Sequence, residues 1–243
     1  MAKARGAASE VAALRARLRE LADPGQIAVL QRFFKTGPGE YGEGDVFIGA
    51  KVPQIRALVR EHKGFELASA EALLGSAVHE ERMLALLLLV RRFERSEDAA
   101  ERRRIYELYL ASTAHIDNWD LVDSSAAQIV GGHLQDRDRA PLYALARSPS
   151  LWERRIAMIA TFFFIRRGDF ADALAIAGIL KGDREDLIHK AVGWMLREIG
   201  SRDREAEEAF LKRHYKTMPR TMLRYAIEKF EEPKRQAYLK GTI

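Results

Sequence analysis

The chain has 243 residues, a formal net charge of +5 at pH 7 and a sequence pI of about 9.4. This length can bury a full core, and we expect one continuous domain over residues 1–243, with Met1–Ser9 frayed. Cysteine is absent, which excludes disulfides, thiolate zinc sites and a cysteine nucleophile. The longest apolar runs, Met83–Val90 and Ile156–Ile165, are far shorter than the ~20 residues of a membrane span. We therefore expect a cytoplasmic protein with no membrane partner.

Helical periodicity begins in the first segment and continues along the chain. Apolar residues recur at three- and four-residue spacing, as at Val11, Leu14 and Leu18. The pattern predicts an all-α protein, because strands would show sustained alternation of apolar and polar residues. Asp23 followed by Pro24 is typical of a helix start, with a capping side chain and a proline in the first turn. We expect roughly a dozen helices joined by short turns.

A longer connection, Thr36–Asp45, follows the second predicted helix. Its glycines have the spacing GxGxxG, but that motif binds nucleotides only between a strand and a helix. Here Phe33–Lys35 ends a helix instead, which argues against nucleotide binding. The connection is either a flexible turn or a mobile loop that brings Tyr41 to a ligand.

Five later segments share one helical register, and one position of that register gives a column of charged residues. The segments begin at His79, Asn118, Leu151, Asp186 and Arg220, and the column consists of Arg82, Asp123, Arg155, Lys190 and Arg224. Successive members lie 41, 32, 35 and 34 residues apart (123−82, 155−123, 190−155 and 224−190). Helical repeats with a period near ~30–47 residues stack into solenoids with a concave binding face. The sequence therefore predicts an α-α superhelix with a concave basic groove that contains one acid.

Trp119 precedes Asp123 by four residues, so both side chains lie on one helix face. Two interpretations remain open. In one, Trp119 belongs to the core and Asp123 pairs with a neighbouring cation. In the other, Arg155 and two aromatic residues, Trp194 and Tyr41, surround the acid on the concave face. Aromatic side chains around a carboxylate suit a cationic or sugar-like ligand.

The cations of the column predict contacts with a polyanion. Arg82, Lys190 and Arg224 are candidate phosphate ligands because they share the phase of the column. If these three cations and Arg155 each neutralise one phosphate, a plot of log affinity for duplex DNA against log salt has a slope of roughly −3.6. Asp120 points about 100° away from Trp119 and is expected to act as a cap or in a salt bridge. The six histidines are scattered without ligand spacing, so neither a metal nor a cofactor is expected.

Five longer segments carry a resemblance to a known family. They are FFKTGPGEYGEGDVFIGAKVPQIR, NWDLVD, SLWERRIA, HKAVGWMLRE and PRTMLRYAIEKF. In order and spacing they resemble the AlkD-like DNA alkylation repair enzymes, a family of HEAT-like-repeat alkylpurine DNA glycosylases. The likeness runs from about Phe33 to about Phe230. It implies a single HEAT-like-repeat glycosylase domain.

The resemblance also implies site residues and a substrate. The family combines a Trp-x-x-x-Asp helix with an arginine and a tryptophan from the next two repeats, which match Trp119, Asp123, Arg155 and Trp194. A tyrosine in the family's N-terminal loop matches Tyr41. The implied partner is double-stranded DNA that bears N3-alkyladenine or N7-alkylguanine, excised as the free base without flipping the nucleotide out of the helix. Such an enzyme is cytoplasmic and associated with the nucleoid when bound to DNA. The sequence leaves any oligomeric partner unknown.

The chemistry of such a substrate explains why one acid suffices. An alkylated purine is cationic and leaves as a neutral base, while positive charge develops on the deoxyribose. A carboxylate ~4 Å from that charge contributes about 4 kcal/mol at an effective dielectric constant of about 20, on the order of a thousandfold in rate. We expect Asp123 to do this, with Arg155 binding a phosphate and keeping the acid ionised. No lysine is placed as a nucleophile, which predicts a monofunctional glycosylase. The alternative is a non-catalytic scaffold that binds DNA or an acidic protein partner.

Overall fold

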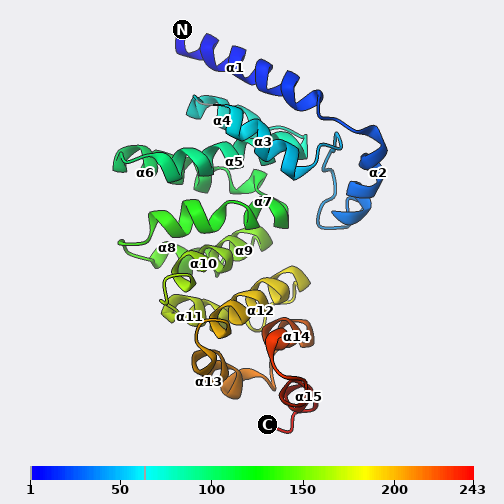
Figure 1. Cartoon of the computed structure of the whole chain (residues 1–243), viewed down its shortest axis with the longest axis vertical. Helices are drawn as coiled ribbons and strands as arrows, with labels where there is room; N and C mark the ends of the chain where they lie inside the picture. Colours follow the sequence, from blue (N-terminus) through cyan, green and yellow to red (C-terminus); the bar gives the residue numbers. More distant parts are fainter. Residues whose placement is uncertain (1, 63) are drawn as a thin grey trace. The chain divides into compact units, whose positions relative to one another are not determined.

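The computed structural model describes residues 2–62 and 64–243, and helices form most of this part of the chain (Figure 1). Within those residues no strand is present, and the one isolated β-bridge joins Val46 to Val78. The predicted all-α fold of helical repeats is therefore confirmed. None of the helices in the described residues is long and apolar enough to cross a membrane.

The chain divides into two compact units, Met1–Ser125 and Ala126–Ile243. The single domain expected from the sequence stays a prediction. Helix α1 begins at Ala2, and Met1 lies outside the described residues. Fraying of Met1–Ser9 likewise stays a prediction.

The first unit is built around one long buried helix, α5. Every residue from Met83 to Val90 is buried in it, and α3 and α4 pack against it. A helix that is apolar all round requires neighbours on all sides, which explains this run. The elements of the unit are α1 (Ala2–Arg19), α2 (Pro24–Phe33), α3 (Val52–Glu61), α4 (Leu67–Leu74), α5 (His79–Arg95), α6 (Ala99–Ala111), a 3-10 turn (Thr113–His115) and α7 (Trp119–Asp123).

The second unit is built around α12, which packs against α9, α13 and α14. Gly193 allows α12 to approach α14 closely, because a Cβ atom there would lie 2.5 Å from the carbonyl oxygen of Met222. The elements of the unit are a π-helical turn (Ala127–Gly131), α8 (Ala140–Leu145), α9 (Leu151–Ala160), α10 (Phe162–Ile165), α11 (Ala171–Leu180), α12 (Asp186–Gly200), α13 (Arg204–His214), α14 (Arg220–Ala226), a 3-10 turn (Ile227–Lys229) and α15 (Glu232–Lys240).

Side-chain caps set several of these helix starts. The carboxylate of Asp23 accepts a hydrogen bond from the backbone N–H of Gly25 at 3.0 Å, with Pro24 in the first turn of α2. The side-chain oxygen of Asn118 accepts one from the N–H of Trp119 at 2.8 Å and begins α7. The cap predicted at Asp23 is therefore confirmed.

Each of the five segments that share a register contains a helix at or next to its first residue, namely α5, α7, α9, α12 and α14. The charged column keeps the same place in each of them. Arg82 is the fourth residue of α5, and the other members are the fifth residues of their helices, namely Asp123, Arg155, Lys190 and Arg224. The sequence register thus matches the observed helix starts to within one residue.

Candidate functional site

The residues singled out by the sequence divide between the two units. The first unit contains Tyr41, Arg82, Trp119 and Asp123, and the second contains Arg155, Lys190, Trp194 and Arg224.

Helix α7 presents the two residues of the Trp-x-x-x-Asp motif. It is five residues long and runs from Trp119 to Asp123. The three residues between them, Asp120 to Val122, are buried, whereas Trp119 and Asp123 are both half-buried. The helix therefore leaves its first and last side chains partly accessible and anchors itself by the middle three.

Trp119 belongs to an aromatic cluster in the first unit. Its ring stacks on Phe34, with centroids 5.4 Å apart, and meets the edge of Phe33 at 5.6 Å. Phe34 in turn stacks on Phe47 at 5.2 Å. These four rings line a cavity of about 400 Å³, and the side chain of Met83 also lies in its wall. Trp119 thus lies where an apolar cavity meets solvent.

Phe33 is an aromatic residue for which the sequence predicted a helix end and no contact with a ligand. It is 60% exposed and lies directly beside Trp119. Tyr41, the residue matched to the family's tyrosine, donates its hydroxyl to the carbonyl oxygen of Phe33 at 3.5 Å, and the ammonium of Lys35 lies 6.0 Å from its ring centroid. The role of Tyr41 stays a prediction, and Phe33 becomes a second candidate. The sequence feature that could have indicated an aromatic surface here is the pair of consecutive phenylalanines, Phe33 and Phe34, at the end of a helix.

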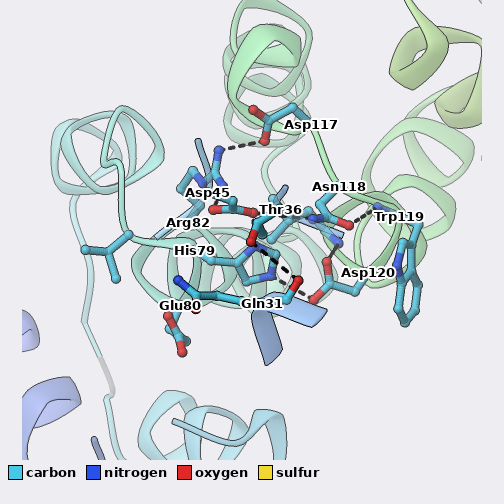
Figure 2. Close-up of polar contacts among 12 residues, drawn as sticks. Gln31, Thr36, Asp45, His79, Glu80, Arg82, Asp117, Asn118, Trp119 and Asp120 are labelled. Carbon is cyan, nitrogen blue, oxygen red and sulfur yellow. Dashed lines mark hydrogen bonds and ion pairs between the residues drawn. The ribbon is translucent and has the colours of Figure 1, made fainter. Parts of the chain in front are cut away.

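A cluster of largely buried charges lies beside the start of α7, which contributes Asp120 (Figure 2). The two ring nitrogens of His79 face two carboxylates: Nδ1 lies 2.7 Å from Oδ2 of Asp45, and Nε2 lies 2.9 Å from Oδ2 of Asp120. Only 4% of the His79 side chain is exposed. Burial alone would lower the pKa of His79, but hydrogen bonds and opposite charge from Asp120 and Asp45 outweigh it and raise the pKa to about 9. His79 is therefore an imidazolium at neutral pH, and the salt bridge or cap expected at Asp120 is confirmed as a salt bridge.

Arg82 joins the same cluster. Its guanidinium donates to Oδ1 of Asp45 at 2.5 Å and to Oδ1 of Asp117 at 2.6 Å, and 6% of its side chain is exposed. The side-chain amide of Asn118 donates to Asp45 at 3.3 Å. In this structure two carboxylates pair with the terminal nitrogens of Arg82, while its buried Nε has no hydrogen-bond partner among the described residues. A phosphate contact at Arg82 would have to compete with these ion pairs.

The column residues of the second unit lie on three helices. Arg155 of α9 is 5% exposed and donates to the carbonyl oxygen of Leu187 at 2.5 Å, near the start of α12. Lys190 forms an ion pair with Asp186 at 2.7 Å, and its hydrogen bond lowers the pKa of that carboxyl. Arg224 is exposed on α14.

Trp194 lies one turn beyond Lys190 on α12 and is half-buried. Its indole N–H donates to Oε1 of Glu198 at 3.2 Å, and its ring centroid lies 5.8 Å from that of Phe162. Phe162 and Glu198 therefore fix the ring of Trp194 within its own unit. Across residues 2–62 and 64–243, no group of three or more histidine, aspartate or glutamate side chains is arranged to bind a metal ion.

Comparison with known proteins identifies the family. A family model described as DNA alkylation repair enzyme matches residues 14–230. The fold is similar to a solved structure described as "Predicted DNA alkylation repair enzyme from Enterococcus faecalis", with a TM-score of 0.66 and 17% sequence identity over 87% of this chain and 97% of that chain. No curated protein matches the chain. Because the family model covers most of its length, the protein belongs to the DNA alkylation repair enzyme family.

Proposed function

We propose that the protein is a monofunctional DNA glycosylase, which hydrolyses the N-glycosidic bond of N3-alkyladenine and N7-alkylguanine in duplex DNA without base flipping. The observation that carries the proposal is α7, which leaves Trp119 and Asp123 partly accessible while Asp120, Leu121 and Val122 anchor it. Membership of the family supports DNA as the substrate.

Asp123 stabilises the charge that develops as the bond breaks. The electron pair of the bond between C1′ and N9 leaves with the purine, which becomes neutral, and the deoxyribose becomes cationic. Water then forms the new bond to C1′ and passes its proton to the carboxylate or to solvent. An ionised acid ~4 Å from the sugar supplies about 4 kcal/mol at an effective dielectric constant of about 20.

Aromatic faces assist the same step. Trp119 contacts the sugar and the DNA backbone, and its ring stabilises positive charge through a cation–π interaction. Phe33 extends this aromatic surface, because it is exposed and meets the edge of Trp119. The resemblance assigns a matching part to Trp194 of the second unit.

The basic residues of the second unit bind the DNA backbone in this proposal. Arg155 binds the phosphate beside the lesion, and Lys190 and Arg224 bind further phosphates. The surface position of Arg224 and the partial exposure of Lys190 support that role. Arg82 of the first unit stays a predicted phosphate ligand, and a phosphate there would compete with its ion pairs to Asp45 and Asp117.

The test measures release of free base. Excess enzyme is mixed with a duplex that contains one N7-methylguanine, and the released purine is quantified by chromatography over time. Asp123→Asn is expected to lower the rate on the order of a thousandfold with DNA affinity nearly unchanged. Asp136→Asn, at an exposed aspartate, serves as the matched control.

Two outcomes would overturn the proposal. Base release by Asp123→Asn as fast as by the parent would remove the role of the carboxylate. A parent protein that binds the duplex tightly in a salt-dependent manner but releases no base would favour the non-catalytic scaffold.

A further inference from the structure

Three segments that are distant in sequence meet at the ring of His79. Asp45 comes from the connection between α2 and α3, His79 begins α5, and Asp120 is the second residue of α7 (Figure 2). The imidazole lies between the two carboxylates with a ring nitrogen directed at each. It therefore links the N-terminal connection to the helix that carries Trp119 and Asp123, beside the hydrogen bond from the cap residue Asn118 to Asp45.

The same ring also contacts two aromatic side chains. Phe47 stacks on His79 with centroids 4.7 Å apart, and Phe34 lies at 5.0 Å. Phe34 also stacks on Trp119. His79 is thus coupled to α7 by two routes, the ion pair with Asp120 and the shared contact with Phe34.

We propose that His79, as an imidazolium that binds Asp45 and Asp120 at once, is a positioning residue that sets the placement of Trp119 and Asp123. The catalytic part of this inference rests on the proposed glycosylase function. The structural part, the placement of Trp119, does not.

The proton count explains why the charged form is needed. An imidazolium has two N–H groups and can donate to both carboxylates, whereas a neutral imidazole has one. Loss of the proton leaves either Asp45 or Asp120 facing a lone pair in a buried site, which is costly for an ionised acid. The link between the connection and α7 then opens at one of its two ends.

The neighbouring charges keep the proton on His79 through the neutral range. The charged groups that face the ring or its direct partners are Asp45, Asp120, Glu80, Arg82, Asp117 and, on the wall of the adjacent cavity, Lys51. Glu80 is itself anchored, since its carboxylate accepts from the backbone N–H groups of Ile48 and Gly49. Because the pKa of His79 is raised to about 9, the double link persists below that pH and is lost above it.

The first experiment uses Trp119 as its own reporter. The chain has three tryptophans, so replacing Trp152 and Trp194 by phenylalanine leaves Trp119 as the one emitter. Emission wavelength and acrylamide quenching are followed from pH 6 to 10.5. A transition with a midpoint near pH 9 is expected, and His79→Gln should abolish it and shift the emission already at pH 7.

Asp120→Asn provides a milder variant in case His79→Gln does not fold. It retains an oxygen that accepts from His79 but removes the charge, so the midpoint should fall from about 9 toward the ordinary range of histidine. His115→Gln, at an exposed histidine of the same unit, should leave the transition unchanged. Identical titrations for the parent, His79→Gln and Asp120→Asn would overturn the inference.

The second experiment measures catalysis with all tryptophans present. Under single-turnover conditions His79→Gln should lower base release on the order of tenfold to a hundredfold while the Kd for DNA stays the same, as expected for displaced catalytic groups. An unchanged rate would remove the catalytic consequence. If the parent released no base, the proposed function would fail, yet the Trp119 titration would still decide whether His79 positions α7.

Discussion

Glu207 of α13 should make the stability of the protein depend on pH in a direction opposite to that of most carboxylates. Its side chain is 1% exposed, and Oε1 has no hydrogen-bond partner among the described residues. The carboxyl group packs against Gly200 at the end of α12, where a Cβ atom would lie 1.6 Å from Oε2. Burial raises the pKa of Glu207 to about 8, even though Arg204, 3.4 Å away, acts against the shift.

The sign and size of this pH dependence follow from the difference in the pKa of Glu207 between the folded and the unfolded protein. In the unfolded chain Glu207 ionises near 4.5, but in the folded protein it keeps its proton until about pH 8. The free energy of unfolding therefore decreases as pH rises from 4.5 to 8 and is constant outside that window as far as this group is concerned. At ~1.4 kcal/mol per pKa unit, the change is on the order of 3–5 kcal/mol.

Glu207→Gln removes this titration and keeps a neutral group of the same shape. Urea denaturation should give similar free energies of unfolding for parent and variant at pH 5, and a variant more stable by several kcal/mol at pH 8.5. Glu205→Gln, at an exposed position of the same helix, should behave like the parent at both pH values. A difference between Glu207→Gln and the parent that is the same at pH 5 and pH 8.5 would refute the reasoning.

Two further predictions concern DNA. The double variant Lys190→Gln/Arg224→Gln should make the slope of log affinity against log salt less negative by roughly 1.8, since two phosphate contacts are lost; an unchanged slope in filter binding would exclude these residues from the interface. Phe33→Ala should slow base release more than Tyr41→Phe while changing the free energy of unfolding by less than about 0.5 kcal/mol, because Phe33 is exposed. The opposite ranking in the single-turnover assay would favour Tyr41 as the aromatic partner of Trp119.

Local signals in the sequence were sufficient to predict the helices and their register. The cap at Asp23 and the helical periodicity depend on neighbours within four residues. The same holds for the register of the column, whose members are the fourth or fifth residues of their helices. Such features are readable because they repeat along one element.

The charge cluster around His79 was not predictable in this way. His79 lies 34 residues from Asp45 and 41 residues from Asp120, and no periodicity connects positions at such separations. Arg82 shows the consequence, because its phase in the column predicted a phosphate contact but gave no sign of the ion pairs with Asp45 and Asp117. The exposure of Phe33 also depends on packing between elements, which the order of residues does not reveal.

The brevity of α7 has a consequence for local dynamics. Five residues are too few for a helix to persist in water by itself, so its lifetime is set by the structure that encloses it. The hydroxyl of Ser125, for example, donates a hydrogen bond to the carbonyl oxygen of Leu121 at 2.6 Å and stabilises the final turn. Amide hydrogen exchange in α7 would therefore measure the free energy of local opening, which is distinct from the free energy of global unfolding. The element to which we assign the chemistry therefore depends on its surroundings for its own stability.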